Sequence, residues 1–428
     1  MTEYRSALIL GFGRSGRAAE ALLQSEGCAT VVASDDRMDD AAFFQCLETV
    51  DFDVCIVSPG FALDHPWMIA VQGAEIPLLS ELELGWSRHK GKTIALTGSN
   101  GKSTAVKWIC ESLVASGLKA EIGGNYGIPA SEVVLEYPDL DWLVLEVSSF
   151  QLETVREFYA DIAVVLNVLP NHLNRHGTMT CYLETKARIF GISEASRICV
   201  IPHELLSDFR GAVSGERNWV TFGAGGVYQF CSGQVFHGLK NVLNLTGTLF
   251  DSPVIGSCTG AAAAAAFEAG GLEMQTLERS AKSFKPLRHR LQRLGEVRGV
   301  FYVNDSKATN LAAMTAALGA IGRDIHLIAG GLPKESDYTF VKEILAERVR
   351  TIYVIGQASR AMFEAWSTVC PCVECGTLEE AFGQAAQAAE AGETVLLSPA
   401  CASFDQFDSF EERGECFERL FNGVKHAG

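Results

Sequence analysis

The chain has 428 residues, enough for two or three domains, and 48% of them are hydrophobic against 20% charged. This composition is that of a globular protein and excludes a disordered one. The formal net charge of −17 argues against nucleic acid or an anionic membrane as a partner, because both would be repelled. An anionic substrate would therefore have to be held by local lysines and arginines.

The sequence gives no sign of a membrane or an export signal. No apolar stretch is long enough to span a bilayer, and residues 1–5 lead straight into a predicted strand, so we expect no signal peptide. The 13 cysteines are scattered and odd in number, which favours reduced thiols. These features predict a cytoplasmic protein.

A glycine-rich turn follows the first predicted strand. Its Gly11, Gly13 and Gly16 have the G-x-G-x-x-G spacing in which backbone N–H groups face a diphosphate. The next strand ends at Asp36 and Arg37, where an acidic residue commonly binds ribose hydroxyls. The turn alone leaves two interpretations open, a nucleotide site and a close packing of strand on helix. The elements expected in this unit are strands at 7–10, 30–33 and 54–57 and helices at 17–24 and from 78 to about 90.

The strongest motif is TGSNGKST at residues 97–104, between a predicted strand at 93–96 and a predicted helix at 105–116. Such a loop directs several N–H groups and the positive end of the helix dipole at one anion. Lys102 can reach the outer phosphates of a nucleotide, and the hydroxyl of Ser103 or Thr104 can ligate its magnesium. The spacing is shorter than the strict pattern, and a capped helix after an ordinary turn is the alternative. The predicted nucleotide contacts are Gly98, Ser99, Asn100, Gly101, Lys102, Ser103 and Thr104.

Candidate metal ligands follow the loop along the chain. Glu146 lies inside a hydrophobic strand expected at 141–152, where a carboxylate is costly unless it is paired or binds a metal. His172 follows the next strand, at the edge where parallel sheets bind ligands, and a surface histidine is the alternative. Lys186 lies on the following helix and by itself would be read as a surface lysine.

After residue 286 the pattern of strands and helices restarts. Each predicted strand ends in small or polar residues, so one edge of this third unit is expected to face a ligand. The strands are expected at 300–303, 325–329, 352–355 and 395–399. The sequence thus predicts an α/β protein of three domains: a Rossmann-like domain at 1–90, a central parallel sheet of the phosphate-loop ATPase type at 91–286 and a Rossmann-like domain at 287–428.

The order of the motifs resembles that of the Mur ligases of peptidoglycan synthesis. The matching stretches are TGSNGKST, LEVSSFQLE, NHLNRH, a Tyr-x-x-x-Lys helix, LRHR, NDSKATN and SPACASFDQF. The resemblance runs from Gly11 to Phe421 and is greatest to the branch that adds D-glutamate. It implies a monomeric cytoplasmic ligase that uses ATP to join D-glutamate to UDP-N-acetylmuramoyl-L-alanine through an acyl phosphate. Asn174 departs from the aspartate of many members, so no role is assigned to it.

The resemblance also implies roles for individual residues. The first domain binds the UDP-sugar, the central domain binds ATP and the last binds the amino acid. The catalytic and metal set is Lys102, Ser103, Glu146, His172 and Lys186, with one or two magnesium ions and with Lys186 carbamylated so that it becomes an anionic ligand. Arg290 and Asp305 are implied nucleotide contacts. The UDP-sugar contacts are Ser15, Asp36, Arg37 and Asn125, and the glutamate pocket is Lys307, Thr309, Lys334, Ser403, Phe404 and Phe410.

Three other functions are weighed against this one. Another Mur ligase or a folylpolyglutamate-type ligase would differ in its amino-acid specificity. A nicotinamide-dependent oxidoreductase would rest on the glycine turn alone and would leave Lys102 and Glu146 unexplained. A nucleotide-sensing module would bind ATP without releasing phosphate.

Overall fold

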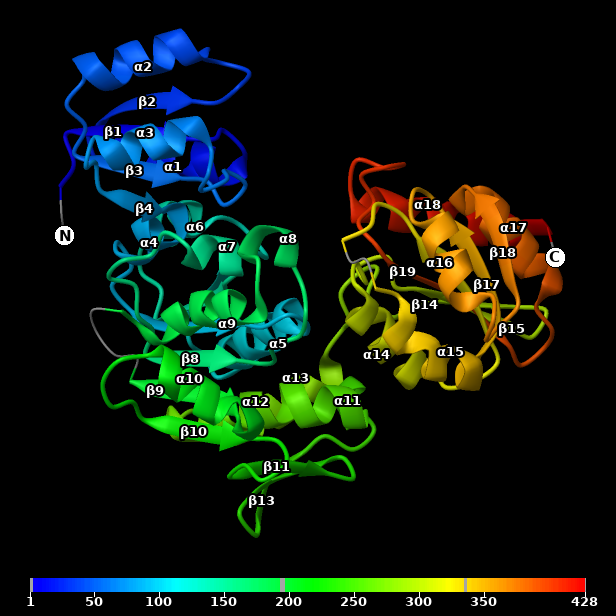
Figure 1. The fold of residues 1–428 in the computed structure, drawn as a ribbon. Coiled ribbons are helices and arrows are strands. Elements are labelled where there is room, and N and C mark those ends of the chain that lie inside the picture. The colour runs from blue at the N-terminus through cyan, green and yellow to red at the C-terminus, as the bar shows by residue number, and fades with distance from the viewer. Residues whose placement is uncertain (1–2, 193–196, 335–336, 428) are drawn as a thin grey trace. The chain divides into compact units, whose positions relative to one another are not determined.

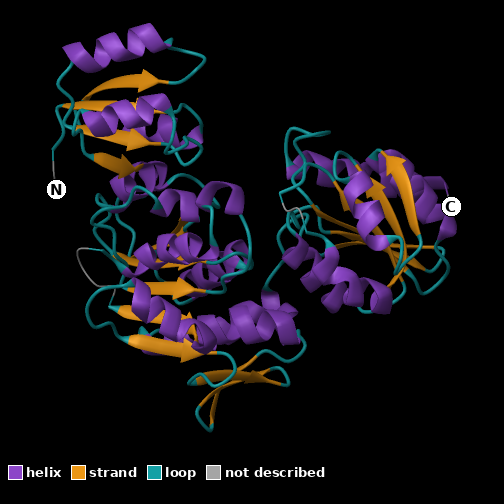
Figure 2. Ribbon diagram, in the orientation of Figure 1, coloured by secondary structure: helices purple, strands orange, loops and turns teal. Residues whose placement is uncertain are grey.

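The computed structural model describes residues 3–192, 197–334 and 337–427, which form three β-sheets with helices packed against them (Figures 1 and 2). The chain divides into two compact units, one made of residues 1–168 and 176–284 and the other of residues 169–175 and 285–428. The mixed α/β class with mainly parallel sheets is confirmed. The three domain boundaries stay predictions.

The first sheet has four parallel strands in the order β2-β1-β3-β4, counted over the described residues. Residues 78–80 were expected to begin a helix, but they form strand β4, and the helix begins at Glu81 because the Ser80 hydroxyl caps it by accepting the N–H of Glu83 at 3.1 Å. The strands are β1 Ser6–Leu10, β2 Ala29–Ala33, β3 Val54–Val57 and β4 Leu78–Ser80, and the helices are α1 Arg14–Ser25, α2 Asp40–Thr49, α3 Pro66–Gly73 and α4 Glu81–Trp86.

The second sheet has nine strands within the described part of the chain, in the order β13-β12-β11-β10-β9-β8-β5-β7-β6. Only β12 pairs in antiparallel fashion, with β11 and β13, among these described strands. The strands are β5 Lys92–Thr97, β6 Ala120–Gly124, β7 Trp142–Glu146, β8 Ile162–Val165, β9 Ile198–Pro202, β10 Trp219–Phe222, β11 Tyr228–Cys231, β12 Gln234–His237 and β13 Lys240–Asn244. The helices that follow these strands are α5 Lys102–Ala115, α6 Ala130–Glu136, α7 Ser149–Leu152, α8 Leu173–His176, α9 Met179–Ala187, α10 Leu206–Ala212, α11 Pro253–Ile255, α12 Ala261–Ala269 and α13 Met274–Ser283.

The core of this sheet is built around helix α5. Trp108 on α5 is fully buried and stacks on Phe250 with ring centroids 3.9 Å apart. The alanine-rich helix α12 is buried along residues 261–266, since small side chains let its backbone lie close to the sheet. These apolar contacts fix the position of α5, whose first turn is the end of the phosphate-loop motif.

The third sheet, in the second unit, has the strand order β14-β15-β19-β16-β17-β18 over the described residues. Strands β14 and β18 were not predicted, because edge strands are half exposed and carry no continuous apolar run, and β14 runs antiparallel to β15. The strands are β14 Gln292–Val297, β15 Val300–Asn304, β16 Ile325–Gly330, β17 Val349–Ile355, β18 Cys372–Gly376 and β19 Thr394–Ala400. The helices are α14 Leu311–Ile321, α15 Lys342–Arg348, α16 Ser359–Trp366, α17 Leu378–Ala388 and α18 Phe410–Ala427.

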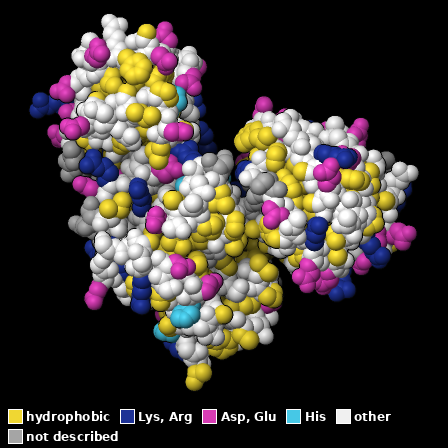
Figure 3. All heavy atoms as spheres, viewed as in Figure 1, with side chains coloured by type: hydrophobic (Ala, Val, Ile, Leu, Met, Phe, Trp, Pro, Cys, Tyr) yellow, Lys and Arg dark blue, Asp and Glu magenta, His cyan; other side chains and the backbone are white. Residues whose placement is uncertain are grey.

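Several short helices connect the main elements. The 3₁₀ helices are η1 Arg188–Phe190, η2 His203–Leu205, η3 Leu249–Asp251 and η5 Thr339–Val341, and a π-helix, η4, spans Gly256–Gly260. Within the described ranges, no helix combines the length and apolar character needed to cross a membrane. On the face seen in Figure 3, acidic side chains are spread among lysines and arginines rather than gathered in one patch.

A buried carboxylate fastens helix α4 to helix α6. Glu81 is 1% exposed, and its Oε1 accepts the N–H of Ser131 at 2.7 Å, at the start of α6. One turn along α4, Gly85 packs so closely that a Cβ there would lie 2.4 Å from the Ser131 nitrogen. Burial raises the pKa of Glu81 to about 7, because it disfavours the charged carboxylate more than the hydrogen bonds from Ser131 favour it.

This pKa predicts how stability depends on pH. A carboxyl group whose pKa is higher in the folded state than in the unfolded state stabilises the fold most at low pH and loses that contribution as the pH rises toward 7. We therefore expect Glu81→Gln to gain stability relative to the unchanged chain by about 2 kcal/mol between pH 5 and pH 8, measured by urea unfolding. Glu136→Gln, at an exposed position of α6, is the matched control and should show no such gain. An equal effect of Glu81→Gln at both pH values would contradict the argument.

Candidate functional site

The phosphate-loop motif lies between strand β5 and helix α5. Gly101 has a left-handed backbone with φ of 84°, which lets the chain turn into the helix at Lys102. The Lys102 ammonium curls back over the loop and donates to the carbonyls of Gly98 at 2.8 Å and Ser99 at 3.2 Å. Ser103 and Thr104 are buried in the first turn of α5. A cation, a helix N-terminus and two hydroxyls therefore converge where an anion would be held.

A second lysine is buried beside this loop. Lys186 on α9 is 1% exposed, and its Nζ donates to Thr97 Oγ1 and to the Gly98 carbonyl, each at 3.2 Å. Burial, and next the charge of Lys102, lower the pKa of Lys186 well below its ordinary value, while Glu146 opposes the shift. The reading of Lys186 as a surface lysine is thus wrong, because its side of α9 packs on the end of β5. The low pKa favours the neutral, nucleophilic amine.

Glu146 ends strand β7 instead of lying inside it, because the chain turns there into helix α7, which Ser148 caps. Its side chain is buried; Oε1 accepts a hydrogen bond from Asn125 Nδ2 at 2.7 Å, whereas Oε2 accepts none from the described residues. A buried carboxylate oxygen without a donor is costly unless a cation binds it. The residues present therefore fit a magnesium ion, which prefers oxygen ligands.

The sequence analysis did not identify two further residues that contact the loop. The Tyr182 hydroxyl lies 3.3 Å from Ser99 Oγ, and the Asn167 carboxamide bonds to the backbone of Ser99 and Asn100. The signal for Asn167 was its place at the end of the predicted strand that precedes His172, at the edge that was expected to bind ligands.

The two histidines of the NHLNRH stretch belong to different units. His172 lies in segment 169–175 of the second unit and has a left-handed φ of 56°, which is uncommon for a residue with a side chain. Its metal role stays a prediction. In the first unit, His176 contacts Ser149 Oγ at 3.0 Å and lies 3.8 Å from a Glu153 carboxylate oxygen. These contacts tie His176 to helix α7 and the residue that follows it, which is a structural role.

At the first sheet, the glycine turn and the residues that follow β2 lie together. A Cβ on Gly16 would lie 2.1 Å from the Gly11 carbonyl, so close strand–helix packing requires that glycine. The Arg37 guanidinium lies 3.6 Å from the centre of the Phe12 ring. Ser34 donates to the Asp36 carboxylate at 2.6 Å, and this bond lowers the pKa of Asp36.

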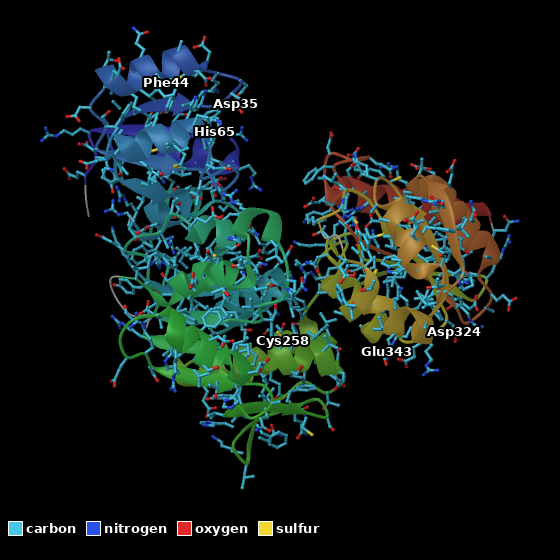
Figure 4. The ribbon with its side chains drawn as sticks, viewed as in Figure 1. Asp35, Phe44, His65, Cys258, Asp324 and Glu343 are labelled. Atoms are coloured by element: carbon cyan, nitrogen blue, oxygen red, sulfur yellow. The ribbon has the colours of Figure 1, made fainter. Side chains whose placement is uncertain are left out.

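The other residues near this turn are placed as follows. Ser15 is half-buried in the first turn of α1, and Asn125, predicted to contact the UDP-sugar, donates to Glu146. His65 and Asp35 approach each other to 4.0 Å at the same end of the sheet (Figure 4). The predicted UDP-sugar contacts thus stay proposals, with Asn125 also bonded to the candidate metal ligand.

In the second unit, Asp305 is buried at the end of β15. Its Oδ1 accepts the N–H of Leu291 at 3.0 Å, and its Oδ2 accepts the Ser398 hydroxyl at 2.9 Å. Burial raises the pKa of Asp305 to about 7, and the nearby Arg290 opposes the rise. Through its bond to the Leu291 N–H, Asp305 fixes the backbone next to Arg290.

Of the predicted glutamate-pocket residues, five lie on loops that follow β15, β16 and β19, and Phe410 is the first residue of helix α18. Lys334 Nζ donates to Thr309 Oγ1 at 3.2 Å, and Lys307 Nζ lies 5.1 Å from the centre of the Phe410 ring. The remaining two lie on the loop after β19, with Ser403 buried and Phe404 70% exposed. The structure thus brings Lys307 to Phe410 and Lys334 to Thr309.

Arg413 joins two of these loops. It is 1% exposed, and its guanidinium donates to Ser306 Oγ at 3.0 Å, to the Ser306 carbonyl at 2.9 Å and to the Cys401 carbonyl at 3.1 Å. Burial lowers its pKa to about 10, so the group remains charged at neutral pH. These bonds fix the loop that carries Lys307 to the loop that carries Ser403.

Comparisons with known proteins match both units. A family model described as the Mur ligase middle domain matches residues 96–268, and one described as the Mur ligase, glutamate ligase domain matches residues 289–401. The UDP-N-acetylmuramoylalanine--D-glutamate ligase of Acidobacterium capsulatum is 33% identical over 97% of this chain and 96% of its own length. The protein of that name from Nitratidesulfovibrio vulgaris strain DP4 is 36% identical over 96% of this chain and 94% of its own.

Solved structures share the fold at low sequence identity. The UDP-N-acetylmuramate-alanine ligase of Thermotoga maritima has a TM-score of 0.62 at 15% identity and covers 98% of this chain and 99% of its own. The MurF ligase of Thermotoga maritima in complex with ADP has a TM-score of 0.61 at 18% identity, with 99% and 95% covered.

The Arg413 bonds predict a loss of stability in the second unit. Arg413→Gln should lower the free energy of unfolding of that unit by about 2–4 kcal/mol, because several buried carbonyl and hydroxyl groups lose a charged donor. Amide hydrogen exchange in strand β19 measures it. Arg419→Gln, at an exposed position of the same helix, is the control and should change little. Equal protection of β19 in the Arg413→Gln and Arg419→Gln variants would refute the prediction.

Proposed function

Because the chain belongs to the Mur ligase family, we propose that it uses ATP to join D-glutamate to UDP-N-acetylmuramoyl-L-alanine, a step of peptidoglycan synthesis. The observation that carries the proposal is the full-length similarity to relatives named for this reaction, at 33–36% identity over 96–97% of the chain. The buried Lys186 and Glu146, with the half-buried Lys102, support ATP chemistry at the end of β5.

The reaction needs a leaving group on a carboxylate. Transfer of the γ-phosphoryl group of ATP to the carboxylate of the UDP-sugar peptide would make an acyl phosphate and release ADP. The amine of D-glutamate would then attack the acyl carbon, and the phosphate would leave with the bonding electrons. Lys102 is placed to neutralise phosphoryl oxygens during the first step, since it already lies over the loop.

Magnesium, when bound, would neutralise phosphate charge and hold the phosphoryl oxygens in place. Ser103, Glu146 and His172 are its proposed ligands, together with Lys186 once its neutral amine has reacted with carbon dioxide to form a carbamate. The burial of Lys186 beside Lys102 supports the carbamate. Burial favours the neutral amine that reacts with carbon dioxide, and the positive charge of Lys102 would stabilise the anionic carbamate.

The remaining roles complete the proposal. Arg290 and Asp305 are proposed to contact the nucleotide. The cations of Lys307 and Lys334 are proposed to bind the two carboxylates of D-glutamate, beside Thr309, Ser403, Phe404 and Phe410. Ser15, Asp36, Arg37 and Asn125 are proposed to bind the UDP-sugar. The free cysteines of the described chain suit a reducing cytoplasm, where we propose that the enzyme acts as a monomer.

Phosphate release tests the proposed reaction. With ATP, magnesium and UDP-N-acetylmuramoyl-L-alanine, we expect release that requires D-glutamate and is at background with L-glutamate, L-alanine or diaminopimelate. A response to another amino acid would assign the chain to a sister ligase of the same fold. No release with any of them would contradict ligation and favour the sensing alternative.

Lys186→Ala tests the carbamate. We expect the rate of phosphate release to fall at least about 100-fold, because a metal-directed anion is lost, and small carboxylic acids to restore part of it. With ¹³C-bicarbonate, the unchanged chain should show a carbamate NMR signal that the variant lacks. Lys282→Ala, at an exposed lysine, should keep both the signal and the rate. An identical spectrum for the unchanged chain and Lys186→Ala would exclude carbamylation of Lys186.

A further inference from the structure

Asn167 connects the end of strand β8 to the phosphate loop. Its Oδ1 accepts the N–H of Ser99 at 3.0 Å and the N–H of Asn100 at 2.9 Å, and its Nδ2 donates to the Asn100 carbonyl at 3.1 Å. The Asn167 carbonyl also accepts the Ser99 N–H, at 3.1 Å. One side chain thus pairs with both polar groups of the Asn100 backbone, as a neighbouring strand would.

The fourth bond of this carboxamide goes to the π-helix η4. Nδ2 donates to Cys258 Sγ at 3.4 Å, and Sγ in turn donates to the Leu166 carbonyl at 3.4 Å. A carboxamide has two acceptor positions and two donor hydrogens, so all four hydrogen-bonding positions of Asn167 are used. Cys258 lies beside helix α11 in the same unit (Figure 4). A rotation of the Asn167 side chain would break the four bonds of its carboxamide together.

These contacts divide the N–H groups of the loop into two sets. The Ser99 and Asn100 N–H groups are already bonded to Asn167, so they are not the groups that wait for a phosphate. The N–H groups of the first turn of helix α5, which begins at Lys102 after the left-handed Gly101, have no acceptor in a preceding helical turn, and such groups commonly bind an anion. Asn167 sets the direction of this turn by holding the two residues before it.

We infer that Asn167 is a positioning residue for ATP: its carboxamide holds the phosphate loop in the binding shape before the nucleotide arrives. The inference rests on the proposed function for the identity of the nucleotide, and it adds a residue that acts through the loop backbone. A loop that is already ordered binds its ligand more tightly, because no conformational entropy of the loop is lost on binding. If Asn167 only stabilised the fold, replacing it would leave the hydrogen exchange of the loop N–H groups and the affinity for the nucleotide unchanged.

The test compares two variants at this position with a surface control. Asn167→Ala removes every side-chain bond to the loop, whereas Asn167→Asp keeps both acceptor positions for the Ser99 and Asn100 N–H groups. Asn241→Ala removes an exposed carboxamide on β13 that bonds to Gln234. Two quantities are measured on the full chain: amide hydrogen exchange at Ser99 and Asn100 without nucleotide, and the Kd for ADP in magnesium buffer by calorimetry.

For Asn167→Ala we expect the Asn100 amide to exchange at least about tenfold faster and the Kd for ADP to rise at least about tenfold, whereas the Ser99 amide keeps its bond to the Asn167 backbone carbonyl. For Asn167→Asp we expect the exchange protection to stay within about threefold of the unchanged chain, and for Asn241→Ala both quantities to stay unchanged. The inference is overturned if Asn167→Ala keeps the protection of the Asn100 amide or the ADP affinity, or if Asn167→Asp loses that protection as fully as alanine does. Should Asn167→Ala not fold, Asn167→Ser, whose shorter side chain has no carboxamide, takes its place with the same expected results. Because neither measurement involves ligation, failure here would leave the proposed reaction standing, and failure of D-glutamate-dependent phosphate release would leave this inference standing.

Discussion

A loop that binds a polyanion must keep its shape before the anion arrives, and here the side chains around the end of strand β5 set that shape. The carboxyl ends of parallel strands meet at one edge, so β5, β7 and β8 deliver the loop, Glu146 and Asn167 to the same place. Lys102 and Lys186 both donate to the Gly98 carbonyl. The chemistry of the site therefore depends on hydrogen bonds that fix backbone atoms.

Buried charge is the second constraint. Lys186 and Glu146 in the first unit, and Asp305 and Arg413 in the second, are all at least 95% buried, which is costly for ionisable groups. Arg413 offsets that cost with bonds to two loops, and Asp305 with bonds from Leu291 and Ser398. Glu146 keeps one oxygen without a donor among the described residues, and its place at the edge that carries the phosphate loop supports its proposed role as a metal ligand.

The sequence predicted the parts of the fold where local pattern and tertiary position agree. Strands β1, β3, β5, β16 and β19 are continuous apolar runs, and the structure has them within a residue or two of the expected limits. The edge strands β14 and β18 were missed because burial on one face leaves only a weak pattern. Residues 78–80 were misassigned because Ser80, the last residue of this short strand, is also the N-cap of helix α4.

The residues of the site that lie in recognisable sequence motifs could be predicted from the sequence. Lys102 and Glu146 stand out by residue type in an apolar context. Lys186 does not, because a lysine on a helix gives no indication that its side chain is buried until the packing of α9 on β5 is known. Asn167 and Arg413 act through backbone groups distant in sequence, up to 107 residues away for Arg413 and Ser306, and no local pattern encodes such contacts.

The account's central claim is that the chain activates a carboxylate by phosphorylating it. The direct test is to label the alanyl carboxylate of UDP-N-acetylmuramoyl-L-alanine with ¹⁸O and to analyse the phosphate released in the presence of ATP, magnesium and D-glutamate. The account predicts that one ¹⁸O atom appears in each phosphate, because the bond broken in the second step joins the acyl carbon to a carboxylate oxygen. Product formed with unlabelled phosphate would contradict an acyl phosphate and the mechanism built on it.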